Sequence, residues 1–207
     1  MTIYIRIKHD ADYIYVLMDF PTDSVIEYAG GTALPTTPAD TAGIVLDTND
    51  DRGTAPHADD YLFRIRWSSP SAYVQITRQG TGSAWSDLLP NPAGFVGASS
   101  MDAGNDPYSP SPHLIYELRV PISYIGQKAT YGAGVLAADG TLGFIGWPQP
   151  FKMSDFMNPN HWGDLNMTEQ VVPEFPSGAL FIATVIVACT LLLLRAKRET
   201  RIQAEPE

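Results

Sequence analysis

Tyr61–Trp67 (YLFRIRW) alternates between bulky apolar side chains and basic ones. Its odd-numbered residues are all aromatic or aliphatic, whereas Arg64 and Arg66 stand between them. Because successive side chains of a strand point to opposite faces of a sheet, this period of two predicts a half-buried β-strand. One face carries the core residues and the other carries the arginines.

Other segments bounded by turn-forming residues have the same character. In His113–Val120 (HLIYELRV), Leu114 and Tyr116 share one face and His113 and Glu117 the other. We predict further strands at 12–20, 43–47, 73–78, 94–98 and 130–138, a strand pattern at 3–8, and one short helical turn at 121–126. Half-buried strands need a second sheet against their apolar faces. The predicted fold class is therefore all-β, a β-sandwich spanning residues 1–168.

The composition excludes several classes of protein. The chain has 207 residues, with 13 Lys and Arg against 23 Asp and Glu, so its formal net charge is −10. Non-specific nucleic-acid binding needs a clustered basic surface, which this balance disfavours. With Cys189 as its single cysteine, the chain forms no intrachain disulfide and no Cys-rich zinc site.

The carboxyl-terminal end predicts a membrane anchor. Ala179–Leu194 (ALFIATVIVACTLLLL) has no charged residue and is followed by Arg195, Lys197 and Arg198. We predict a stem at 169–177, a transmembrane helix at 178–194 and a cytoplasmic tail at 195–207, with the main domain extracellular. The alternative is a buried core helix.

The residues before this span carry a motif. Val171–Pro176 (VVPEFP), followed by an apolar helix and a basic cluster, resembles the archaeal PEF-CTERM sorting signal, and the resemblance rests on Pro173, Glu174, Phe175 and Pro176. It implies an archaeal cell-surface protein and an archaeosortase-type processing enzyme as partner. The alternative is an ordinary stop-transfer anchor. Met1–Asp12 is not a hydrophobic export signal, so we expect that the given chain lacks its true beginning.

The order of segments in the main domain also suggests a family. Asp59–Phe63 (DDYLF), Tyr116–Ser123 (YELRVPIS), Trp147-Pro148 and Asn160–Leu165 (NHWGDL) together are similar to the family 9 carbohydrate-binding module, within the DOMON-like superfamily. The resemblance implies a β-sandwich that binds a glycan, usually through a pair of aromatic residues that grip a terminal sugar. The sequence does not assign both members of such a pair.

An acidic loop offers ligands for a cation. Asp47, Asn49 and Asp51 place oxygen atoms at alternate positions before Gly53, and Asp59 and Asp60 follow shortly after. Alternate positions in a tight loop can direct several oxygens at one hard cation, as calcium requires. The alternative is a solvated hairpin loop, since Asp and Asn tolerate turn geometry.

Tryptophans are the candidate sugar platforms, because their faces cover the C–H surfaces of sugars. Trp67 and Trp162 have strand-like surroundings and are expected in the core. Trp85, between Ala84 and Ser86, and Trp147, before Pro148, are expected in loops and are the predicted carbohydrate-binding residues.

Two other interpretations remain. A structural or adhesive surface domain would bind no small ligand. A haem-binding DOMON-like module would draw its axial ligands from the methionines and histidines, of which the candidates are Met18, Met101, His57, His113 and His161. The sequence contains no GxSxG, HExxH or phosphate-binding loop, so we expect a protein that is not an enzyme.

Asn166-Met167-Thr168 is a glycosylation sequon in the predicted stem region.

Overall fold

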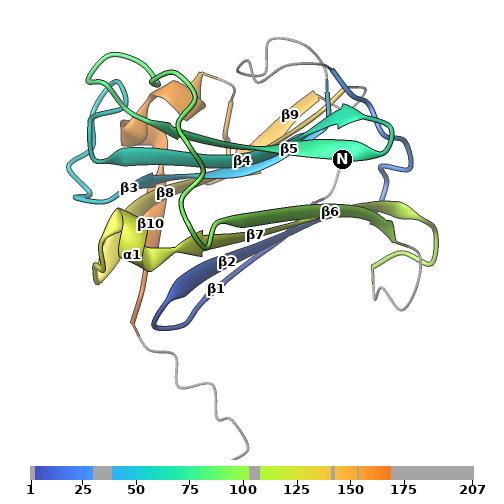
Figure 1. The fold of residues 1–207 in the computed structure, drawn as a ribbon, viewed down its shortest axis with the longest axis horizontal. Helices are drawn as coiled ribbons and strands as arrows, with labels where there is room; N and C mark the ends of the chain where they lie inside the picture. Colours follow the sequence, from blue (N-terminus) through green and yellow to red (C-terminus); the bar gives the residue numbers. More distant parts are fainter. Residues whose placement is uncertain (1–2, 30–38, 103–107, 141–142, 153, 169–207) are drawn as a thin grey trace, which may run out of the picture. The chain divides into compact units, whose positions relative to one another are not determined.

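The computed structural model describes residues 3–29, 39–102, 108–140, 143–152 and 154–168, which form two antiparallel sheets packed face to face (Figure 1). Sheet A has the strand order β1-β2-β7-β6. Its strands are β1 (Tyr4–His9), β2 (Tyr13–Phe20), β6 (Val96–Asp102) and β7 (His113–Pro121).

Sheet B has the order β10-β8-β3-β4-β5, and β9 also pairs with β8. Its strands are β3 (Thr41–Asp47), β4 (Asp60–Ser69), β5 (Ala72–Gln79), β8 (Thr130–Asp139), β9 (Gly143–Trp147) and β10 (Gly163–Asn166). Three short helices complete the fold: α1 (Ile122–Ile125), η1 (Asp155–Met157) and η2 (Pro159–His161).

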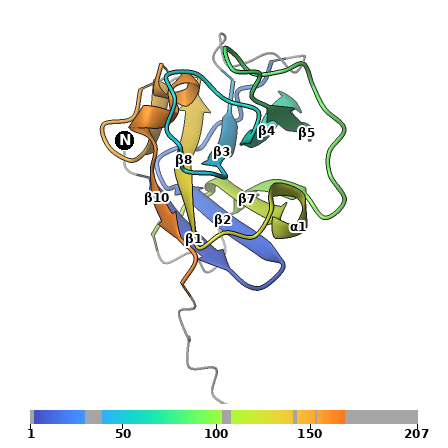
Figure 2. The same ribbon diagram turned by 90° about the vertical axis from the view of Figure 1, so that its left-hand side faces the viewer.

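The predicted all-β sandwich is confirmed, and each strand expected from the sequence is present. Two strands were missed, β9 (GFIGW) and β10 (GDLN). Each is short and contains glycine, so neither has a recognisable period of two. Both strands pair with β8, at different parts of its length: Gly163 of β10 pairs with Ala133, and Trp147 of β9 pairs with Val135. Figure 2 shows β10 beside β8.

The described residues contain no helix long and apolar enough to cross a membrane. The predicted anchor at 178–194, the stem with Pro173–Pro176 and the tail at 195–207 all lie outside the described residues.

The main core lies between the two sheets. β2 contributes Ile14, Val16 and Met18, and β4 contributes Phe63 and Ile65, all with 2% exposure or less. Phe63 and Ile65 are among the alternate residues that the period of two assigned to the apolar face. The expectation that Trp67 and Trp162 belong to the core is confirmed, since they are 6% and 2% exposed.

The outer face of sheet B is also covered, which the sequence did not indicate. A second apolar cluster lies on this face; its members are Val45, Leu62, Trp85, Leu136, Phe151, Phe156 and Trp162. Arg64 and Arg66, expected on a half-buried strand's polar face, are therefore 0% and 2% exposed. Burial lowers the pKa of Arg64 to about 9, and the nearby Arg66 and Arg78 act in the same direction.

The sheets approach closely at Gly97 of β6. A Cβ atom built on Gly97 would lie 1.9 Å from Cγ2 of Ile65 on the facing strand β4. A side chain at this position therefore forces the two sheets apart or displaces Ile65.

We predict that Gly97→Ala lowers the free energy of unfolding by about 1–3 kcal/mol through this overpacking. The measurement is urea denaturation of the purified chain. Ala98→Ser, on the outer face of the same strand, is the matched control and should change stability by less than about 0.5 kcal/mol. Equal stability of Gly97→Ala and the unsubstituted chain would contradict the close approach.

Candidate functional site

The loop between β3 and β4 brings acidic residues together because its two ends are paired. Asp47 ends β3 and faces Asp60, the first residue of β4, across the antiparallel register. Between them the backbone turns sharply, with φ values of 51° at Asp50 and 53° at Arg52. We call residues 47–60 the acidic loop.

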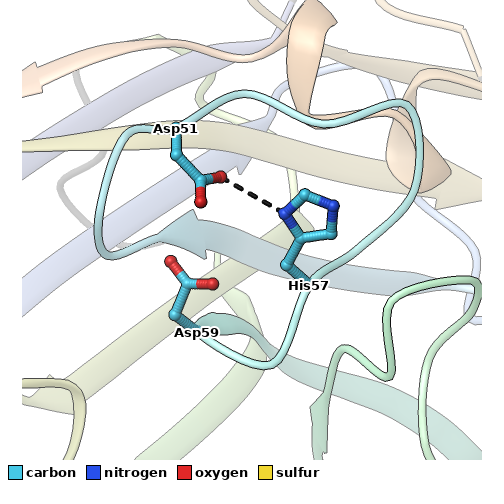
Figure 3. Close-up of side chains that lie close together, drawn as sticks. All are labelled: Asp51, His57 and Asp59. Atoms are coloured by element: carbon cyan, nitrogen blue, oxygen red, sulfur yellow. Dashed lines mark hydrogen bonds and ion pairs between the residues drawn. The ribbon is translucent and has the colours of Figure 1, made fainter.

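Carboxylate oxygens converge inside the acidic loop. One oxygen each from Asp47, Asp59 and Asp60 lies within 4.8 Å of the others, and Asp51, His57 and Asp59 form a second such group. Figure 3 shows the side chains of Asp51 and Asp59 directed towards His57, with His57 Nδ1 3.3 Å from Asp51 Oδ1. Asp59 belongs to both groups, which together comprise four carboxylates and one imidazole.

Backbone amides hold the buried carboxylates in place. Asp47 accepts hydrogen bonds from the amides of Asn49 at 3.1 Å and Arg52 at 3.0 Å. Asp60 Oδ2 accepts one from the amide of His57 at 2.6 Å. Asp60 Oδ1 is buried and has no hydrogen-bond partner among the described residues. An unsatisfied buried acceptor carries a desolvation cost that a bound cation or a proton would remove.

The electrostatics of the loop point the same way. Burial raises the pKa of Asp60 to about 7, and the negative charges of Asp47 and Asp59 raise it further. Burial also raises the pKa of Asp47. Neighbouring buried carboxyl groups do not all ionise at neutral pH unless a positive charge lies among them. The donor set of carboxylate oxygens matches calcium, which prefers oxygen ligands.

Four of the five predicted calcium ligands thus come together: Asp47, Asp51, Asp59 and Asp60. Asn49 differs, because its Oδ1 accepts a hydrogen bond from Lys128 Nζ at 3.1 Å. His57 joins the group and was missed as a loop ligand, since only the tertiary arrangement brings it next to Asp51. The sequence places His57 three residues before Asp60, and this proximity was the available indication that His57 belongs to the loop site.

The acidic loop is tied to the segment that follows β9. Arg52 donates from Nη1 to the carbonyl of Trp162 at 2.7 Å, and its guanidinium also pairs with Asp50 and Asp164. The amide of Asn160 donates to the carbonyl of Gly53 at 3.0 Å. Order in the acidic loop is therefore transmitted to residues 160–164.

Trp85 is not the solvent-facing platform that its small neighbours suggested. It is 7% exposed, and its ring is parallel to that of Trp162, with a centroid distance of 6.2 Å and an interplanar angle of 4°. Phe156 packs against the same ring at 5.6 Å. Trp85 thus covers the outer face of sheet B, and its Nε1 has no hydrogen-bond partner among the described residues.

Trp147 is half-buried at the edge of sheet B. It packs against the core between the sheets, and a Cβ atom built on Gly163 would lie 2.7 Å from its Cη2. Its ring therefore crosses β10 and keeps part of its surface accessible. The structure does not bring Trp85 and Trp147 into one site.

A groove of about 350 Å³ follows directly after Trp147 in the chain. It is lined by Pro148, Gln149, Pro150, Lys152, Asp155 and His161. His161 Nδ1 lies 2.5 Å from Asp155 Oδ1, and the Trp162 indole donates from Nε1 to the carbonyl of Asp155 at 2.9 Å. This groove combines proline rings with amide, ammonium, carboxylate and imidazole groups. Sequence reasoning missed it because its lining comes from a segment without periodicity.

A second hollow, of about 420 Å³, lies on the outer face of sheet A. Its lining includes Arg6, Tyr15, Glu117 and Arg119. The Tyr15 hydroxyl donates to Asp10 Oδ2 at 2.8 Å, and this contact fixes the ring on the sheet face.

The remaining predicted residues are dispersed. Met18 is fully buried in the core, and Met101 is half-buried against it. His113 is also fully buried, with Nε2 3.0 Å from Asp19 Oδ1, so the haem candidates do not form one group. Asn166 ends β10 and is exposed, and its Oδ1 accepts a hydrogen bond from Thr130 at 3.0 Å.

Comparison with solved structures identifies the fold. A family 9 carbohydrate-binding module from Caldicellulosiruptor kristjanssonii in complex with cellotriose is similar, with 16% sequence identity and a TM-score of 0.51 over 83% of this chain and 77% of that one. The same kind of module from that organism in complex with glucose gives 17% identity and a TM-score of 0.51 over 82% and 78%. The likeness shows that this chain shares the β-sandwich fold of these modules. No protein-family model matches the sequence, and no curated protein is similar to it.

We predict that calcium stabilises the chain through the acidic loop. At a calcium concentration 100 times the dissociation constant, one site adds about 2.7 kcal/mol, which corresponds to a rise in Tm of about 5–10 °C. Differential scanning calorimetry after EDTA treatment and calcium addition measures this. Asp60→Asn should reduce the rise, and Asp87→Asn, which removes an exposed charge elsewhere, should not. An equal rise in all three proteins would contradict the site.

We also predict that Trp85→Ala lowers the free energy of unfolding by about 3–5 kcal/mol, because it removes a large buried ring from the cover of sheet B. Chemical denaturation followed by circular dichroism measures the change. Leu88→Ala, at an exposed position of the same segment, is the control. If Trp85→Ala is as stable as the unsubstituted chain, the Trp85 ring does not contribute to the packing on the outer face of sheet B.

Proposed function

We propose that this protein is a non-catalytic carbohydrate-binding module displayed at the surface of an archaeal cell. We further propose that the sugar binds in the groove lined by Pro148, Gln149, Pro150, Lys152, Asp155 and His161. The observation that carries the proposal is the composition of this groove. Gln149, Lys152, Asp155 and His161 offer donors and acceptors for hydroxyl groups within one concave site. Small-ligand sites generally combine a few such polar groups with apolar walls.

The apolar walls suit a sugar ring. The side chains of Pro148 and Pro150 border the groove, and both can contact the C–H face of a pyranose. Asp155 is held by its contact with His161 and by the amide of Lys152, which donates to its Oδ2 at 2.7 Å. A carboxylate fixed in this way binds hydroxyl groups with little loss of side-chain freedom.

Calcium in the acidic loop would hold the groove in shape. Asp47, Asp51, Asp59 and Asp60 would supply the oxygens, and the hydrogen bond between Gly53 and Asn160 connects their loop to the groove segment. Trp162 belongs to the same segment, and its stacking on Trp85 anchors this segment to the outer face of sheet B. We therefore expect calcium removal to weaken sugar binding without abolishing the fold.

The similar solved modules bind cellotriose and glucose, which favours a glucan as the first ligand class to test. Surface display rests on the sequence of residues 173–198, with the anchor at 178–194 and its processing by an archaeosortase-type enzyme as parts of the proposal. Membrane fractionation of cells that produce the chain tests the anchor: recovery of the intact chain in the soluble fraction would contradict it.

The sugar proposal is tested by a glycan array followed by isothermal titration calorimetry with the best ligand. We expect His161→Ala and Gln149→Ala to weaken binding at least tenfold, because each removes a hydrogen-bonding group from the groove. Incubation of the ligand with the chain should release no new reducing ends, since no catalytic step is proposed.

Three aromatic variants locate the site. Tyr28→Ala, which removes an exposed ring elsewhere, should leave binding unchanged. Trp147→Ala tests whether the half-buried ring at the edge of β9 also contacts the sugar. If Tyr15→Ala abolishes binding while His161→Ala does not, the sugar binds on sheet A and the groove proposal is wrong.

A further inference from the structure

A second group of carboxylates lies at the other end of β3. One oxygen each from Asp23, Asp40 and Asp139 lies within 4.8 Å of the others, and the three residues are 5%, 0% and 4% exposed. Asp40 directly precedes β3 and Asp47 ends it, so the two groups are separated by the length of that strand, about 20 Å.

The three carboxylates come from both sheets. Asp23 follows β2 of sheet A, and its carbonyl accepts a hydrogen bond from the amide of Leu114 in β7 at 3.0 Å. The carbonyl of Asp40 accepts one from the amide of Trp67 in β4 of sheet B at 3.0 Å. Asp139 ends β8 in the same sheet. The backbone thus fixes the positions of these residues independently of any ligand.

Asp40 has an oxygen without a partner. Its Oδ2 accepts a hydrogen bond from the amide of Glu27 at 2.6 Å, whereas its Oδ1 is buried and accepts none from the described residues. A fully buried carboxylate oxygen without a partner is rare, because water or a donor normally satisfies it. This observation is independent of the clustering and itself indicates a missing positive ligand.

The charges around the group are negative. Burial raises the pKa of Asp23 to about 7, and the carboxylates of Asp139 and Glu27 raise it further. Burial likewise raises the pKa of Asp40 to about 8, with Asp23 and Glu27 adding to the effect. The buried phenol of Tyr116 faces the same carboxylates. Ionising three such carboxylates together requires a cation among them.

We propose that Asp23, Asp40 and Asp139 bind a second hard divalent cation of the calcium class, which ties sheet A to sheet B. Oxygens that share one calcium ion at about 2.4 Å lie at most about 4.8 Å apart, and the three oxygens of this group all lie within 4.8 Å of one another. Glu27, whose side chain lies against Gly140, is placed to add a further oxygen. The site differs from the acidic loop and does not depend on sugar binding.

Calorimetric titration of the full 207-residue chain with calcium, after EDTA treatment and at pH 8, tests the proposal. We expect two bound equivalents for the unsubstituted chain. Asp40→Asn should lose one equivalent and Asp60→Asn the other, and the double variant should bind none. Asp87→Asn should keep both.

Further measurements keep the test decisive. If Asp40→Asn does not fold by circular dichroism, Asp139→Asn replaces it. A single equivalent in the unsubstituted chain that Asp60→Asn removes would overturn this inference while supporting calcium in the acidic loop. An Asp40→Asn variant that is more stable than the unsubstituted chain, with unchanged calcium stoichiometry, would show that the group holds protons instead. A single equivalent in the unsubstituted chain that Asp40→Asn removes and Asp60→Asn leaves would count against the acidic-loop site only.

Discussion

The burial of β3 on both faces is the constraint on which the rest of the structure depends. All seven residues of Thr41–Asp47 are buried, because sheet A covers one face and the second apolar cluster covers the other. A central strand of this kind exposes no residue to solvent. Polar groups adjoining its two ends must therefore be satisfied inside the protein. Asp40 and Asp47 lie at opposite ends of the strand, each within a group of carboxylates, and each accepts a hydrogen bond from a backbone amide.

This arrangement gives the two ends different roles. At the Asp47 end the carboxylates lie in a long loop that is hydrogen-bonded to the segment bearing the groove. At the Asp40 end they connect residues of both sheets. A cation at the first end would order a binding surface, whereas a cation at the second would join the layers of the sandwich. The same ligand chemistry would thus serve binding in one place and stability in the other.

The cover of sheet B links these features to the proposed sugar site. Trp85 and Trp162 stack over the outer face, and Trp162 fixes Asp155 through its indole N–H. Arg52 holds the carbonyl of Trp162 from the side of the acidic loop. The groove therefore rests on rigid neighbours, which lowers the entropy lost when a ligand binds.

The sequence by itself determined the β-sandwich, because alternation in stretches such as Tyr61–Trp67 reports which side chains a sheet must bury. It also predicted most of the carboxylates that come together in the acidic loop, since their spacing is local. Only the tertiary structure decided that Arg64 and Trp85 are buried and that His57 joins Asp51. Those outcomes depend on which distant segment covers an outer face or closes a loop. A local pattern records the period of a strand, but it carries no information on contacts made by residues far apart in the chain.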